Sequence, residues 1–185
     1  MALVELINEE KDSLGARSMN EMVKRLTTIN WYKNVGQQNI EAEQKIDQFM
    51  SSLNIHEYEI RWISRDQVTK TILRLSFEGS AFWEALKEVP DQLKEKIVHA
   101  GNDTLLADMV DKIPEAIFHG AYSQAFNFFS DEEAVQFLVG HAMYVSVLAC
   151  AAELTEGNNT FLPIVELLEA GHLPLGPEGD IFYLL

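Results

Sequence analysis

Two glutamate–histidine pairs have the residue types and the spacing that metal chemistry needs. The members of each pair are four residues apart, which places both side chains on one face of a helix. Sites in helical bundles draw carboxylates and imidazoles from facing helices, but the di-iron pattern spaces Glu and His three apart and adds a Glu from each of two other helices. The set here is incomplete, and local helix ion pairs are the alternative interpretation. The candidate metal ligands are Glu95, His99, Glu115 and His119.

His141 is a candidate of a different kind, because it lies in the most apolar stretch of the chain. A histidine in such surroundings could ligate a haem iron or act as a buried base. The stripe Phe118, Tyr122, Phe126 and Phe129 could then wall a cofactor cleft. The alternative is a core histidine bonded to a backbone carbonyl beside an aromatic core, which is the commoner use of a stripe at helical spacing. We therefore predict no cofactor, with a divalent metal or haem as the alternative.

No stretch of the sequence carries a catalytic signature, and we predict no catalytic residues. The glycine-rich phosphate loops, the paired cysteines of zinc sites and the nucleophile elbow are all missing. The single cysteine, Cys150, has no basic neighbour in sequence that would lower its pKa. It cannot form an internal disulfide, and the first 14 residues do not fit a secretory signal. These features favour a cytoplasmic protein and do not favour an enzyme.

Negative charge is concentrated in the second half of the chain. The 185 residues carry a formal net charge of −15 at pH 7. Residues 1–100 hold 13 Lys and Arg against 16 Asp and Glu, whereas residues 101–185 hold one Lys against 13 acids. Nucleic-acid backbones and anionic membranes would be repelled, because both need cations to neutralise their phosphates. We expect neither among the partners, and we expect a basic protein to be attracted.

The carboxylates of this acidic half are the candidate partner-binding residues. The selected ones lie at the start of the longest apolar segment and in a helix near the C-terminus: Asp131, Glu132, Glu133, Glu166 and Glu169. In the alternative interpretation these acids serve solubility and complement the dipoles of helix first turns.

The elements that must position these residues are mainly helices. Apolar residues recur at helical spacing, and prolines and glycines punctuate the pattern. Pro90 and Pro114 are each expected to end one helix and begin the next. The expected helices cover about 39–53, 80–89, 90–101, 103–112, 114–129, 131–154 and 161–170.

Two segments are harder to assign. Residues 56–62 alternate in polarity, which favours a strand, but Ser64 and Gln67 suit a helix cap. We favour a helix over 65–75, with a β-hairpin as the alternative for 55–77. Near the C-terminus, residues 176–180 are expected to form a turn between two short apolar strands.

The apolar segment 135–154 is long enough to be tested as a membrane span. Its flanks are acidic and have no Lys or Arg that would anchor it in a bilayer, so we predict a buried helix instead. Ser130 to Glu133 resembles a capping box that opens this helix. The predicted fold is mainly α: a multi-helix bundle around the apolar helix at about 131–154, with a small β-hairpin or extended tail at the C-terminus.

Length and composition fit one folded domain over 1–185, with a soft internal boundary near 79. Apolar residues make up 47% and charged residues 23% of the chain, as is usual for globular proteins. The predicted function is a non-enzymatic acidic binding module, similar to an inhibitor or immunity protein, that engages a basic protein partner. The alternative is a helical enzyme or carrier that holds a metal or an apolar cofactor in a cleft between helices. The sequence does not specify an oligomeric state.

Overall fold

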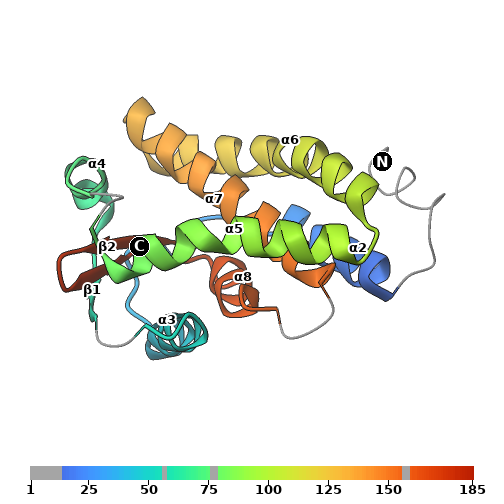
Figure 1. Cartoon of the computed structure of the whole chain (residues 1–185). Helices are drawn as coiled ribbons and strands as arrows, with labels where there is room; N and C mark the ends of the chain where they lie inside the picture. The colour runs from blue at the N-terminus through green and yellow to red at the C-terminus, as the bar shows by residue number, and fades with distance from the viewer. Residues whose placement is uncertain (1–13, 56–57, 76–78, 156–158) are drawn as a thin grey trace.

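The structure of the chain is a computed structural model that describes residues 14–55, 58–75, 79–155 and 159–185. Figure 1 shows its arrangement, a layer of long helices with a small sheet at one end. The helices are α2 (Leu14–Thr27), α3 (Ile40–Ser52), α4 (Val68–Ile72), α5 (Ala81–His99), α6 (Asp103–Phe128), α7 (Glu132–Glu153) and α8 (Leu162–Glu169). A 3-10 turn, η1 (Arg65–Gln67), precedes α4, and the strands are β1 (Glu59–Trp62), β2 (Pro174–Glu178) and β3 (Ile181–Leu184). The predicted mainly α class is confirmed.

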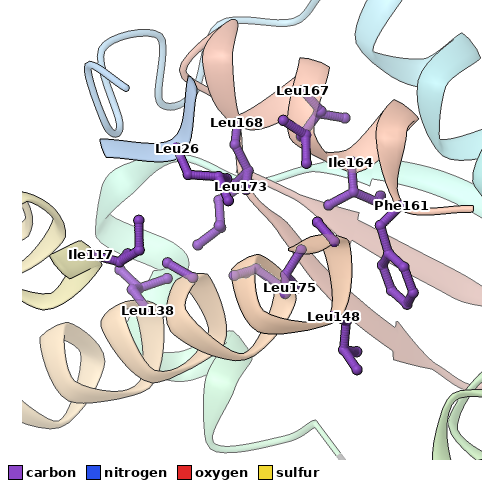
Figure 2. Packing of buried hydrophobic residues seen from close by; sticks show 14 of the residues in the cluster. Leu26, Ile117, Leu138, Leu148, Phe161, Ile164, Leu167, Leu168, Leu173 and Leu175 are labelled. Carbon is purple, nitrogen blue, oxygen red and sulfur yellow. The ribbon is translucent and has the colours of Figure 1, made fainter. Parts of the chain in front are cut away.

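Helix α7 is the centre of the fold, as the sequence predicts. It begins one residue later than the proposed capping box, because the side chain of Asp131, not Ser130, accepts a hydrogen bond from the amide of Ala134 (2.9 Å). The helix is long and apolar enough to cross a membrane, but 61% of its most apolar 18-residue window is buried inside the protein. Figure 2 shows Leu138 and Leu148 of α7 among apolar side chains from α2, α6, α8 and β2.

Helices α6 and α7 pack against each other, and both contribute small buried side chains to the core. Ala121 and Ala125 of α6 and Ala142 and Ala149 of α7 are fully buried. Small residues let two helix backbones approach closely, which brings the larger neighbours into contact as well. Helix α7 also packs against α2, α4, α5 and α8, and α3 packs on α8.

The predicted C-terminal hairpin is confirmed, and it belongs to a larger sheet. Strands β2 and β3 pair antiparallel, and β1 pairs parallel to β3, so the strand order is β1-β3-β2. Leu173 and Leu185 exchange two backbone hydrogen bonds of 2.8 and 2.9 Å, which close the open end of the hairpin. The last residue, Leu185, is therefore fully buried.

Residues 55–77 contain both of the predicted alternatives in part. Residues 56–57 of the alternating segment lie outside the described residues, and 59–62 form β1. The partner of β1 is β3 at the far end of the chain, so there is no local hairpin among the described residues. The favoured helix is present in short pieces, η1 and α4. The predicted cap is present too, with Gln67 Oε1 accepting from the Ser64 amide (2.9 Å) and hydroxyl (3.2 Å).

The expectation that two prolines end helices is wrong. Pro90 lies inside α5 and Pro114 lies inside α6, so four predicted helices are two long ones. An internal proline costs about 3 kcal/mol, since it removes one backbone hydrogen bond and crowds the preceding turn. In α5 this cost is offset by burial of Leu93 and Ile97 beyond the proline, because each such side chain contributes about 1.5–3 kcal/mol.

Candidate functional site

The two predicted metal-binding pairs lie on α5 and α6. The ring of His99 contacts the backbone carbonyl of Glu95 (Nδ1 to O, 2.7 Å), not its carboxylate. Glu115 and His119 are exposed on the outer side of α6. Within the residues that the structure describes, no three His, Cys, Asp or Glu side chains gather around a common point. The structure therefore does not bring the two pairs into one site.

Two of the five predicted partner-binding carboxylates are engaged inside the protein. Arg25 of α2 donates two hydrogen bonds of 2.9 Å to the carboxylate of Glu169. Lys45 of α3 forms an ion pair with Glu166. Both contacts join residues 1–100, which hold nearly all of the Lys and Arg, to the acidic second half of the chain, so the fold neutralises part of the charge that is uneven along the sequence.

The other three predicted carboxylates lie together at the start of α7. Asp131 is the N-cap and uses its side chain on the helix. Glu132 and Glu133 are exposed in the first turn, where the helix dipole favours negative charge. Glu132 also accepts a weak hydrogen bond from Gln136 (3.3 Å). The exposed carboxylates of Glu132 and Glu133 therefore remain available to a partner.

A row of exposed aromatic side chains runs along α6. Phe118 is 39% exposed, Phe126 is 55% exposed, and Tyr122 between them is partly buried. Their rings contact one another in sequence, with centroids 5.1 Å apart for Phe118 and Tyr122 and 5.5 Å apart for Tyr122 and Phe126. We call these three residues the aromatic row. The interpretation of the stripe as core is confirmed for its fourth member, Phe129, which is buried, but it is wrong for Phe118 and Phe126; the neighbouring row Ile117, Ala121 and Ala125 is the one that is buried along its length.

The aromatic row lies on the side of α6 that the N-terminal segments do not cover. The opposite flank of α6 carries Gly120, Gln124 and Phe128. Each of these comes directly before a buried residue in the sequence. Gln124 donates to the carbonyl of Ile29 (3.4 Å), and the Arg65 guanidinium lies 5.0 Å from the centre of the Phe128 ring. The aromatic row, one position after the buried row, therefore faces away from these contacts.

Acidic residues border the aromatic row. Asp111 and Glu115 are exposed, and they lie on the outer face of α6 next to the row. Neither forms an ion pair with a described residue, whereas Asp108 pairs with Lys112 (3.0 Å). Over residues 81–153, which include α5, α6 and α7, the chain has four Lys, no Arg and 12 Asp and Glu. An apolar strip with a negative border is the result.

A second feature is a cleft of about 440 Å³ between α5 and α7. Helix α5 contributes Trp83, Leu86 and Lys87, and α7 contributes Phe137, His141 and Tyr144. A volume of this size is in the range that takes a small molecule, roughly 300–1,000 Å³. The indole of Trp83 is held by the hairpin, because Gly176 (φ +113) leaves room for it where a Cβ would lie 2.4 Å from Cζ2.

His141 is one of three polar residues that line the described part of this cleft, together with Lys87 and Gln136. Burial lowers its pKa to about 4, and a hydrogen bond with the Pro174 backbone opposes the shift. Proline has no amide hydrogen, so the Pro174 carbonyl must accept and one ring nitrogen of His141 must donate. The other nitrogen of the neutral ring then carries a lone pair, and no described residue donates to it. His141 also borders a small apolar cavity of about 20 Å³ beneath the cleft.

Sequence reasoning identified His141 and its neighbours on the same helix but missed the residues that α5 contributes to the cleft. Trp83 and Lys87 come from a helix about 55 positions earlier in the chain, and no motif connects them with α7. Gly140 lines the cleft as well, and a glycine within a helical pattern is the one local signal that could have been noticed.

Comparisons with known protein families, with curated proteins and with solved structures gave no match for this chain.

Proposed function

We propose that the protein is a non-enzymatic binding module that holds a basic protein partner on the outer side of α6, as an inhibitor or immunity protein covers its target. The observation that carries this proposal is the aromatic row, in which Phe118 and Phe126 are exposed beside the exposed carboxylates of Asp111 and Glu115. Apolar side chains exposed in a contiguous strip are typical of interaction surfaces.

The aromatic row supplies what the centre of an interface needs. Large aromatic side chains bury much area on binding and lose little conformational entropy, because they have only two side-chain torsions. The ring contacts along the row, 5.1 and 5.5 Å between centroids, hold the three side chains in place before a partner arrives. Less ordering is then required on binding, which favours affinity.

The carboxylates supply attraction at longer range. Asp111 and Glu115 lie beside the row, and Glu132 and Glu133 lie at the start of α7. A basic partner would be steered towards this surface, and the attraction would weaken with salt over a Debye length of about 8 Å at physiological ionic strength. Glu166 and Glu169 contribute less to this proposal than the sequence suggested, because Lys45 and Arg25 already neutralise them.

Quantitative affinity capture with matched variants tests the proposal. The tagged wild-type protein, the double variant Phe118→Ser/Phe126→Ser and the double variant Asp111→Asn/Glu115→Gln are each exposed to extract of the native host and eluted with a salt gradient. We expect a basic protein that the wild type retains, that the serine variant loses and that the charge variant releases at lower salt. The captured proteins are identified by mass spectrometry.

The control is Leu73→Ser, which removes an apolar side chain outside α6 that is more exposed (70%) than Phe118 or Phe126. This variant must retain the partner as the wild type does, and all variants must keep the wild-type circular dichroism spectrum. If the serine variant and the control retain the same proteins, α6 is not the binding surface. A wild-type protein that retains no basic protein at low salt would refute the proposal as a whole.

A further inference from the structure

The cleft between α5 and α7 has a glycine at its floor that packing does not require. A Cβ atom on Gly140 would meet no described atom within 4 Å apart from its own helix backbone. A glycine inside a helix nevertheless costs about 1 kcal/mol relative to alanine, because it loses more backbone entropy on folding. The stability cost at Gly140 is unexplained by any neighbour, and the position lines the cleft.

The lining of the cleft excludes charged ligands. No Asp or Glu is among the described residues that line it, so a cation would meet no carboxylate among them. The one cation among these described lining residues, Lys87, forms an ion pair with Glu84 (2.9 Å), and the surrounding helices carry a large excess of acids. An anion would therefore be repelled by the wider surface, and an uncharged ligand remains.

The aromatic residues of the cleft favour a flat ligand, and His141 favours a ligand with one hydrogen-bond donor. Trp83, Phe137 and Tyr144 line the cleft, and aromatic rings bind other rings by stacking or by edge contacts. At Gly140 a flat ring could approach the helix backbone without a side chain in between. One nitrogen of His141 is committed to the Pro174 carbonyl, and the other can accept a hydrogen bond from a ligand N–H or O–H.

We propose that the cleft between α5 and α7 binds a small uncharged aromatic molecule of two or three fused rings that carries one N–H or O–H donor. The volume of about 440 Å³ exceeds the roughly 150 Å³ that holds a single benzene ring, so it suits more than one ring. This inference goes beyond the proposed function, because it concerns α5 and α7 and does not depend on the partner at α6.

The test uses indole as the probe, since it is a fused, uncharged ring system with one N–H. The full chain, labelled with ¹⁵N, is titrated with indole and followed by the amide signals of Gly140 and His141. We expect saturable shifts with a Kd on the order of 1 mM for so small a ligand. The analogue 1-methylindole has no N–H and should bind about 5- to 10-fold more weakly, because the acceptor on His141 is left without a donor.

Two glycine variants separate a binding role from a structural one. Gly140→Ala and Gly140→Leu should both raise the melting temperature, and Gly140→Leu should weaken indole binding at least about 10-fold by filling the cleft. Gly120→Ala is the matched control, because Gly120 also lies inside a helix and a Cβ there would make an ordinary contact of 3.7 Å with Trp31. It should leave indole binding unchanged.

Three outcomes would overturn the proposal. The first is the lack of saturable shifts in Gly140 and His141 up to the solubility limit of indole. The second is a loss of stability in both Gly140 variants, which would give the glycine a structural role. The third is that a basic, tryptophan-containing peptide shifts these signals while free indole does not, which would assign the cleft to a side chain of a protein partner.

Discussion

Acidification from pH 7 to pH 5 is expected to destabilise the protein through His141. Burial lowers the pKa of this residue to about 4, whereas an unfolded histidine titrates near 6.5. Because the pKa in the folded state is the lower one, protons bind preferentially to the unfolded chain. The stabilisation is therefore complete above about pH 6.5 and is lost progressively as the pH falls towards 4.

The size of the effect follows from the distance between the two pKa values. At pH 5 the unfolded histidine is almost fully protonated, whereas the folded one is protonated in about a tenth of the molecules. The 1.5 pH units between 6.5 and 5 correspond to about 2 kcal/mol, at about 1.36 kcal/mol per unit. Burial lowers the pKa of His172 as well, with Lys33 adding to the shift, so this residue acts in the same direction.

Urea denaturation of the wild type and of His141→Gln at both pH values measures the contribution of His141 alone. Glutamine can still donate to the Pro174 carbonyl but does not titrate, and His172 is common to both proteins. We expect the wild type to lose about 2 kcal/mol more than the variant between pH 7 and pH 5. Equal losses in the two proteins, or an NMR titration of the folded His141 ring near pH 6.5, would refute the reasoning.

Three further predictions concern stability and are checked by urea denaturation at pH 7. Gly176→Ala should lower the free energy of unfolding by about 2–4 kcal/mol, because its Cβ would overlap the Trp83 ring and the φ of +113 is strained for alanine. A smaller decrease would mean that the Trp83 ring can move away. Tyr32→Phe should stabilise by about 1 kcal/mol, since the buried hydroxyl has no partner among the described residues, and a loss of stability would reveal one. A double-mutant cycle on Arg25 and Glu169 should give a coupling of about 0.5–1 kcal/mol that falls with added salt, because both side chains are about a third exposed; a salt-independent value would contradict this.

Helical segments were predictable from the sequence wherever the residues within the segment itself determine the helix. The spacing of apolar residues located α3, α7 and α8. The prediction that Pro90 and Pro114 end helices was wrong. It took account of the backbone hydrogen bond that proline removes, but not of the side chains that are buried in the turns after the proline. Leu93 and Ile97 continue the buried face of α5 in phase with Leu86, and that burial depends on helices elsewhere in the chain.

Pairing over long distances in sequence was beyond prediction. The alternation in 56–62 correctly indicated a strand, but nothing local specifies a partner about 120 residues away. The register pairs Glu59 with Ile181 and Trp62 with Leu184, and it forms only once the rest of the chain has brought the two segments together. A parallel pair needs a crossover connection, so a hairpin was the natural but wrong local alternative.

The aromatic row shows why a correct helical period does not identify the buried face. The sequence gives α6 two adjacent apolar rows, one with Phe118, Tyr122 and Phe126 and one with Ile117, Ala121 and Ala125. Hydrophobicity favours burial of the aromatic row. Close packing against α7 favours the small residues, because two alanines one turn apart let the backbones approach. The choice depends on α7, which an analysis of α6 by itself does not include.

The distribution of charge along the sequence differs from its distribution in the folded protein. Along the sequence 13 of the 14 Lys and Arg lie in residues 1–100, and the net charge of the last 85 residues suggested a uniformly acidic surface. In the fold, Arg25 and Lys45 lie against Glu169 and Glu166, so a carboxylate near the C-terminus is not necessarily a free one. A binding surface for a basic partner must combine unneutralised carboxylates with exposed apolar area. Exposed charges alone speed the approach of a partner but contribute little to the affinity of the complex. That combination is present on α6, and only the fold distinguishes it from the acids that stabilise the protein internally.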